Sequence, residues 1–129
     1  MDVHSVDVDS ADVLIVDAAN VVGSVPDGWW RDRRGAAERL RDRLAARGTG
    51  EEIVLVVEGA AKGVESVPGV RVDAAPGSGD DRIVELVAAY AERGGGGGVV
   101  VVTADRALRE RVGAYGARCV GPRTVRPAD

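Results

Sequence analysis

Residues 13–20, VLIVDAAN, decide the fold of this chain. Four apolar residues, three of them β-branched, end abruptly at the carboxylate of Asp17, and the amide of Asn20 follows three residues later. An apolar run of this kind predicts a buried strand with a polar end. Open α/β sheets bind ligands beyond the carboxyl ends of their strands, so Asp17 and Asn20 stand where such folds carry their chemistry.

Similar apolar runs recur along the chain. They predict further strands at residues 53–57, 70–72, 99–102 and 118–120. Helical spacing of apolar residues predicts helices at about residues 33–47, from about residue 80, and at about residues 106–112. The segment between Asn20 and residue 33 contains Gly, Pro and Asp-Gly signals and is expected to form a loop. Strands that alternate with helices predict an α/β domain.

The length of 129 residues suits a single domain. We place this domain at residues 12–122, between a mobile N-terminal tail at residues 1–11 and a C-terminal tail at residues 123–129. The N-terminal tail is polar, rich in aspartate and without helical period. It contains the only histidine, His4, so chemistry based on a histidine base or on zinc is not expected.

Cysteine usage and hydropathy bear on the compartment. The single cysteine, Cys119, cannot form an internal disulfide. The first residues are acidic where a secretory signal is basic, and no apolar run approaches the length that spans a membrane. These features predict a cytoplasmic protein without membrane association.

Charge is segregated along the chain, although the net charge is only −4. Residues 31–47 hold seven arginines and three acids, and residues 106–126 hold six arginines and one acid. Acids dominate residues 1–30 and 48–105. An acidic centre flanked by arginine-rich elements would suit a phosphate polymer that reaches a metal site. Two solvated helix faces are the alternative, and composition alone favours them.

Acids follow three of the predicted strands and open one predicted helix. Asp17, Glu58 and Asp105 come at or just after strand ends, and Asp80 and Asp81 lie in the first turn of the helix from residue 80. Right-handed crossovers would bring these positions to one edge of the sheet. Capping and turn formation explain each acid singly. Together, four or five carboxylates would repel one another unless cations lie between them, and all-oxygen ligation suits Mg²⁺ or Mn²⁺.

Trp29 and Trp30 precede the arginine-rich helix. Paired aromatics most often cover apolar surface, here the start of that helix. Their position beside Arg31, Arg33 and Arg34 also suits a platform on which unpaired nucleotides stack. Both interpretations stay open at this point.

Four motifs span about residues 13–120, nearly the whole predicted domain. They are VLIVDAANVVGS, VVEG, GDDRIVELV and VVVVTADRALRERVGAYGA. Their order and spacing resemble those of PIN-like nucleases, in particular the NYN branch. The resemblance implies a three-layer α/β sandwich with a central, mainly parallel sheet of four to five strands. It also implies metal-dependent hydrolysis of RNA phosphodiester bonds.

The resemblance maps the metal-binding acids of this family onto Asp17, Asp80 and Asp105, with Asp81 or Glu58 as a further ligand. The residues expected to orient ligands or to hold substrate are Asn20, Thr103, Arg106, Trp29, Trp30, Arg31, Arg33 and Arg34. Two positions depart from the common pattern. Glu58 stands where relatives commonly place Asp, and Ala104 stands where Ser is frequent.

We therefore expect an endoribonuclease that uses Mg²⁺ or Mn²⁺ to activate water for attack on single-stranded RNA. Assembly into a homodimer is possible. A noncatalytic RNA-binding module of the same fold is the first alternative. A phosphohydrolase that acts on nucleotides is the second. Metal-dependent turnover would separate the nuclease from the binding module, and a comparison of rates on nucleotides and oligonucleotides would separate the two enzymes.

Overall fold

A computed structural model describes residues 11–94 and 98–126. It contains five strands: β1 (Val13–Asp17), β2 (Glu52–Val57), β3 (Arg71–Ala74), β4 (Val99–Val102) and β5 (Arg118–Val120). All neighbouring strands pair in parallel, in the order β3-β2-β1-β4-β5. The predicted strands are thus confirmed, and the boundaries that differ from the prediction do so by one or two residues. Residues 1–10 of the N-terminal tail expected at residues 1–11 lie outside the described residues, as do residues 95–97 and 127–129.

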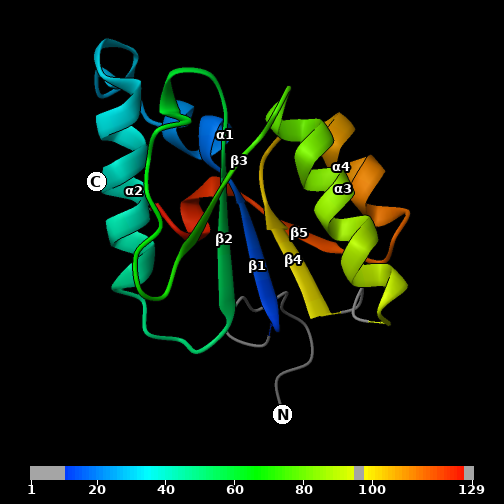
Figure 1. The fold of residues 1–129 in the computed structure, drawn as a ribbon. Helices are drawn as coiled ribbons and strands as arrows, with labels where there is room; N and C mark the ends of the chain where they lie inside the picture. The colour runs from blue at the N-terminus through cyan, green and yellow to red at the C-terminus, as the bar shows by residue number, and fades with distance from the viewer. Residues whose placement is uncertain (1–10, 95–97, 127–129) are drawn as a thin grey trace.

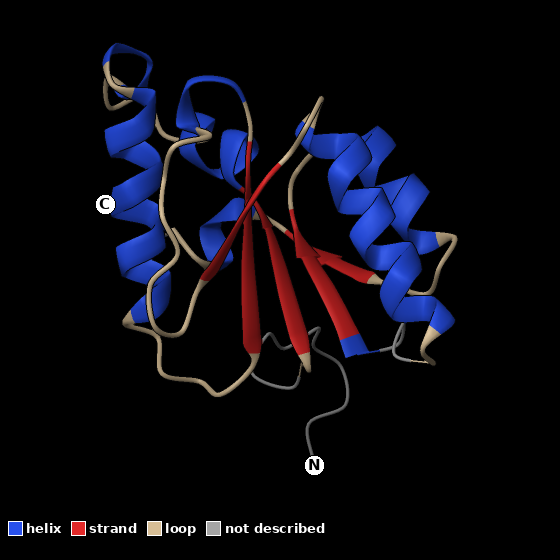
Figure 2. Cartoon of the chain, in the orientation of Figure 1, coloured by secondary structure: helices blue, strands red, loops and turns tan. Residues whose placement is uncertain are grey.

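Helices cover both faces of the sheet (Figures 1 and 2). The α-helices are α1 (Ala18–Gly23), α2 (Arg33–Ala45), α3 (Gly79–Glu92) and α4 (Arg106–Gly113). Short 3-10 turns are η2 (Trp29–Arg31), η3 (Gly59–Ala61) and η5 (Pro122–Thr124). In Figure 1, α2 lies on the left of the sheet and α3 and α4 lie on the right. The expected three-layer α/β sandwich is confirmed.

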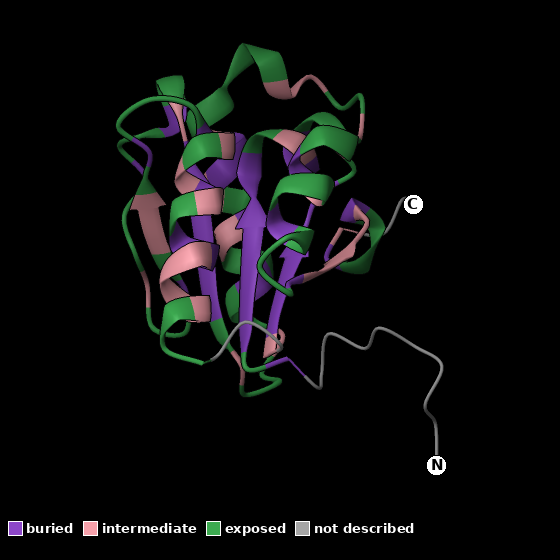
Figure 3. Cartoon of the chain, turned by 90° about the vertical axis from the view of Figure 1, so that its right-hand side faces the viewer, coloured by how far each residue is buried: buried purple, intermediate pink, exposed green. Residues whose placement is uncertain are grey.

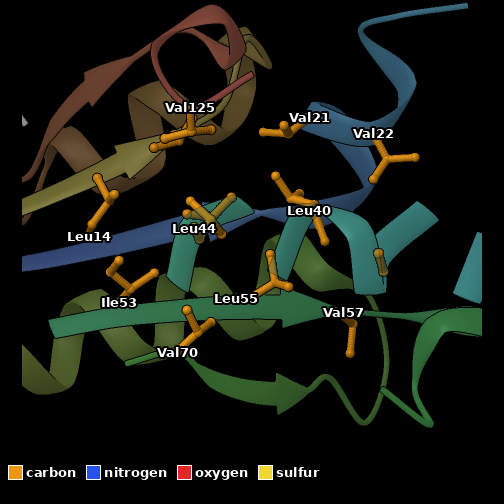
Figure 4. Close-up of a cluster of buried hydrophobic side chains, with 14 of the residues drawn as sticks. Leu14, Val21, Val22, Leu40, Leu44, Ile53, Leu55, Val57, Val70 and Val125 are labelled. Carbon is orange, nitrogen blue, oxygen red and sulfur yellow. The ribbon is translucent and has the colours of Figure 1, made fainter. Parts of the chain in front are cut away.

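The core consists of two apolar layers, one on each face of the sheet. Every residue of β1 and β4 is buried, which explains why these strands read as continuous apolar runs (Figure 3). On one face, Leu14 and Leu55 pack with Leu40 and Leu44 of α2 (Figure 4). The other face is filled largely from α3 and α4. Because the chain contains no Phe, short branched side chains fill both layers.

The loop expected after Asn20 is wrong in its first part, because α1 begins directly after β1. The Asp17 side chain accepts a hydrogen bond from the Asn20 backbone N–H at 3.4 Å and so acts as the N-cap of this helix. Val21 and Val22 bury its inner face. One and a half turns are too short to reveal a helical period in the sequence.

The C-terminal tail expected from residue 123 is also wrong for its described part. Val125 is buried in the layer that contains α2, and Arg126 donates a hydrogen bond to the Val22 carbonyl oxygen at 3.0 Å. Arg126 also pairs with the Asp27 carboxylate. The folded chain therefore continues to Arg126, held by one apolar side chain and one arginine. Within the described ranges, no helix has the length and apolarity needed to cross a membrane.

Candidate active site

The strand order places a switch point at the centre of the sheet. From β1 the chain moves outward through β2 to β3, and it then returns through α3 to β4 on the opposite side of β1. In open α/β sheets, ligands bind where the connections run in opposite directions, which here is at the carboxyl ends of β1 and β4, and we call this region the crevice. Asp17 is the last residue of β1, and Thr103 directly follows β4. The candidate site is therefore built around these two residues.

A hydrogen-bond network fixes the Asp17 side chain. The Thr103 hydroxyl donates to Asp17 Oδ2 at 3.0 Å, and the Asn20 backbone N–H approaches Oδ1. Thr103 also accepts a hydrogen bond from the Asp105 backbone N–H at 3.1 Å. Thr103 is fully buried and Asp17 is 4% exposed. One buried hydroxyl thus links the carboxylate of β1 to the loop that follows β4.

Asn20 forms a second link across the same crevice. Its side-chain Oδ1 accepts a hydrogen bond from the Ala104 backbone N–H at 2.9 Å. Asp105 caps α4, because its side chain accepts a hydrogen bond from the Leu108 backbone N–H at 3.0 Å. The Arg109 side chain donates a hydrogen bond to the Thr103 carbonyl oxygen. These bonds determine the conformation of the β4–α4 loop.

Asp80 and Glu58 approach the crevice from α3 and β2. Ser78 caps α3 by accepting a hydrogen bond from the Asp81 backbone N–H, which agrees with the capping spacing in the sequence. Glu58 Oε1 accepts from the Gly79 backbone N–H at 3.0 Å. A Cβ atom at Gly79 would lie 2.5 Å from that oxygen, so only glycine allows this approach. Asp80 follows Gly79 and lies half-buried in the first turn of α3.

The carboxylates of the crevice interact electrostatically. Burial raises the pKa of Asp17 to about 6, the hydrogen bonds from Thr103 and Asn20 oppose this increase, and the charges of Asp80 and Glu58 add to it. Burial likewise raises the pKa of Asp80, and the nearby charges of Asp105 and Glu58 add to it. Asp17, Glu58, Asp80 and Asp105 are thus one electrostatic group, although they come from four separate parts of the chain.

Asp81 is directed to a different partner. Its Oδ1 accepts a hydrogen bond from Arg111 of α4 at 3.0 Å, and its side chain is 69% exposed. The pairing fastens α3 to α4 outside the crevice. Among the acids expected at the site, Asp81 is therefore the one that forms an ion pair with an arginine, Arg111.

The donor chemistry of the crevice fits a hard divalent cation that keeps much of its water. Within the described residues, no three side chains of His, Cys, Asp or Glu are arranged to hold one metal ion together. Mg²⁺ is commonly bound through only one or two carboxylates, with water in its other positions. Asp80 and Asp105 lie only partly buried at the rim, and Asp17 lies at the base. These acids can therefore bind a hydrated ion of this kind through one or two carboxylates.

The expected substrate-binding residues lie mostly on the α2 side. Arg33 lies over the Trp29 ring, with 5.2 Å between the guanidinium carbon and the ring centroid, and Arg31 lies over Trp30 at 5.8 Å. Trp29 is half-buried against the core, whereas Trp30 is 50% exposed. Arg34 pairs with Glu38 at 3.5 Å. The packing interpretation therefore applies to Trp29, and Trp30 is free to contact a ligand.

Arg106 is exposed at the first position of α4, directly after Asp105. Gly79 and Arg111 were not predicted because their partners, Glu58 and Asp81, lie 21 and 30 residues away. Arg109, which bonds to Thr103 six residues earlier, was not predicted either. A pocket where α1, η2, α2 and η3 meet was also not predicted. Small residues from three separate segments, α1, α2 and η3, line much of this pocket, and no local sequence pattern predicts such an arrangement.

Comparison with known proteins adds evidence on the fold. No protein-family model and no curated protein matches the chain. Among solved structures it is similar to Rae1 (YacP) from Bacillus subtilis, with a TM-score of 0.66 and 21% identity, and to a point mutant of that protein, with a TM-score of 0.65 and 22% identity. Both alignments cover 88% of this chain and 70% of the other. The fold is PIN-like. At this identity the similarity bears on architecture alone.

Proposed function

We propose that this PIN-like chain is a metal-dependent endoribonuclease, with Mg²⁺ or Mn²⁺ held at the carboxyl edge of the sheet. The observation that carries the proposal is a buried carboxylate at the switch point with further acids near it: burial, with a smaller contribution from the charges of Asp80 and Glu58, raises the pKa of Asp17 to about 6. Helix capping alone does not require a carboxylate to be buried, and burying Asp17 near Asp80 and Glu58 destabilises its charged form. Perturbed carboxylates of this kind cluster at functional sites. The motif resemblance and the PIN-like fold support the same reaction class.

One or two of the carboxylates of Asp17, Asp80 and Asp105 would bind the ion directly, and the others would interact with it through its bound water. When bound, it would lower the pKa of a coordinated water and neutralise charge on the phosphate. Thr103 holds the Asp17 carboxylate in one orientation, and Asn20 holds the loop that carries Asp105. Neither residue needs to touch RNA. Glu58 is held at the crevice by Gly79 and contributes negative charge there.

The substrate proposed here is single-stranded RNA in the cytoplasm. Arg106 flanks the acids from α4, and Arg31, Arg33 and Arg34 flank them from η2 and α2. These exposed guanidinium groups would bind phosphates on either side of the bond that is cleaved. The exposed Trp30 ring beside Arg31 would provide a stacking surface for an unpaired base.

The test is the Asp17→Asn variant, assayed for Mn²⁺-dependent cleavage of single-stranded RNA. Cleavage should fall by more than about 100-fold, because even residues that only orient metal ligands contribute about 10–100-fold. Asp32→Asn is the matched control, since Asp32 also caps a helix but is exposed at the start of α2. Undiminished cleavage by Asp17→Asn would end the proposal.

A noncatalytic RNA-binding module is the second candidate, and one observation favours it. No three acidic, His or Cys side chains of the described residues converge on a single metal position. If the wild-type chain binds RNA but shows no turnover with either Mg²⁺ or Mn²⁺, this candidate replaces the first.

A further inference from the structure

The pocket that the sequence analysis missed lies next to the acidic crevice. Its volume is about 140 Å³, and it is partly open. Its walls come from α1, η2, α2 and η3, and α1 and α2 lie side by side on one face of the sheet (Figure 1). Glu58 lines this pocket and also interacts with Asp17 and Asp80 in the crevice. Glu58 could therefore contact a ligand in the pocket and act electrostatically on whatever binds in the crevice.

The size of the pocket suits one flat ring system. Its apolar surface is built largely from Ala18, Ala37 and Ala61, whose side chains end at Cβ and leave space beside Trp29. Pockets for drug-sized ligands hold about 300–1,000 Å³, whereas an apolar cavity of about 150 Å³ accommodates one benzene ring. A whole nucleotide would not fit, but a nucleobase can enter with its sugar left outside.

Opposite charges stand on two walls of the pocket. Arg33 is positioned by its contact with the Trp29 ring, and Glu58 is positioned by the Gly79 N–H. In the described part of the chain no ion pair joins the two side chains, although both line the same space. A ligand that carries donors along one edge and acceptors along another would bridge them.

We propose that this pocket binds a guanine base of the RNA, with Glu58 as the specificity-determining residue. Guanine alone among the four bases has two adjacent N–H donors on its Watson–Crick edge, which match the two oxygens of a carboxylate. Glu58 Oε1 can accept from both Gly79 and the base, because each carboxylate oxygen has two lone pairs. Arg33 would donate to guanine O6 and N7, the commonest arginine–base contact. This inference rests on the proposed function, because it takes RNA as the substrate.

The other bases fit this charge pattern less well. Cytosine and adenine each offer one amino donor to Glu58, but a ring nitrogen acceptor stands beside it and would face the carboxylate. Uracil offers a single N–H between two carbonyl oxygens. Discrimination by a good bidentate contact corresponds to about 10-fold or more in affinity.

The first experiment measures binding without turnover. In the Trp30→Phe variant the only remaining tryptophan is Trp29, which lines the pocket, so its fluorescence reports occupancy. Titration with UUGUU, UUIUU, UUAUU, UUCUU and UUUUU in EDTA should show the tightest binding for UUGUU. Inosine lacks the 2-amino group and should bind about 10-fold more weakly. Equal affinity for all five RNAs, or tightest binding of a sequence without guanine, would overturn the proposal.

The second experiment locates the preference on Glu58. Glu58→Gln keeps an acceptor for the Gly79 N–H but replaces one carboxylate oxygen with an amide donor, so the preference for guanine should disappear. Glu65→Gln removes the same charge from an exposed residue outside the pocket and should leave the preference intact. Ala60→Leu adds bulk at an exposed wall position, and it should weaken UUGUU binding without loss of folding. Retained guanine preference in Glu58→Gln would overturn the role of this residue.

A cleavage assay separates this inference from the proposed function. Mn²⁺-dependent cleavage of all five RNAs at similar rates, with equal binding, would overturn the guanine pocket and leave the ribonuclease intact. Tight, Glu58-dependent binding of UUGUU without cleavage of any RNA would support the pocket and overturn the ribonuclease.

Discussion

The two sides of the proposed RNA path differ in how their side chains are held. At the β1–β4 crevice, Asp17, Thr103 and Asn20 are fixed by hydrogen bonds that cross between strands. On the η2–α2 side, Trp30, Arg31 and Arg33 are exposed. Arg31 lies over the Trp30 ring, Arg33 lies over the Trp29 ring, and the two tryptophan rings meet edge to face. Chemistry requires fixed geometry, whereas binding of varied sequences tolerates movement. The difference suggests that reaction and capture are divided between these two regions.

This comparison predicts that charge removal at the crevice changes stability strongly. A rise in the Asp17 pKa from 3.8 to about 6 costs the ionised folded state about 3 kcal/mol, at about 1.4 kcal/mol per pKa unit. Because the folded state binds the proton more tightly, this cost is absent below about pH 4 and develops as the pH rises through about 6. Denaturant unfolding in metal-free buffer should show Asp17→Asn more stable than wild type at pH 7.5, by up to this amount.

The pH dependence provides the control. Near pH 4 the stability advantage of Asp17→Asn should shrink toward zero, because wild-type Asp17 is then protonated in the folded state. Asp32→Asn, at the exposed cap of α2, should differ from wild type by less than about 0.5 kcal/mol, since Asn and Asp cap helices equally well. An Asp17→Asn variant less stable than wild type at pH 7.5 would contradict the assigned cost of burying the ionised carboxylate.

The second prediction concerns the hydroxyl that joins the two strands. Thr103→Val keeps the shape of a fully buried side chain but removes the donor to Asp17 and the acceptor for the Asp105 N–H. Mn²⁺-dependent cleavage should fall about 10–100-fold, and the free energy of unfolding should fall by about 1–3 kcal/mol. Thr103→Ser retains the hydroxyl and should retain most of the activity. Equal losses in Thr103→Val and Thr103→Ser would assign the effect to packing and not to the hydrogen bonds.

Much of the fold could be predicted because its central strands, β1, β2 and β4, are buried on both faces. Runs such as those of β1 and β4 leave few alternatives, and the polar residues after them mark the carboxyl edge of the sheet. Helix α1 escaped prediction because Asp17 combines a strand end with a helix cap, with no loop between them. Residues 123–126 escaped it because a single buried valine and one arginine hold them.

The candidate site could be predicted only in part, because its partners are far apart in the sequence. Positions after strands and at helix starts indicated which acids could gather at one edge. The pairing of Asp81 with Arg111 spans 30 residues, and that of Glu58 with Gly79 spans 21. Neither pairing has a local sequence signature. The sequence therefore could not distinguish Asp81, which pairs with α4, from Glu58, which is held beside the crevice.

The smallest predicted effect lies on the exposed side. Arg31→Gln should weaken binding of single-stranded RNA only a few-fold and reduce the slope of log affinity against log salt by about 0.7, the value for one phosphate contact. Arg93→Gln is a matched control, because Arg93 also lies 5.8 Å from an aromatic centroid, that of Tyr90, but at the far end of α3 from the crevice. It should leave the slope unchanged. If Arg31→Gln instead abolished cleavage at saturating RNA, the η2–α2 side would take part in the reaction, and the division between capture and chemistry would be wrong.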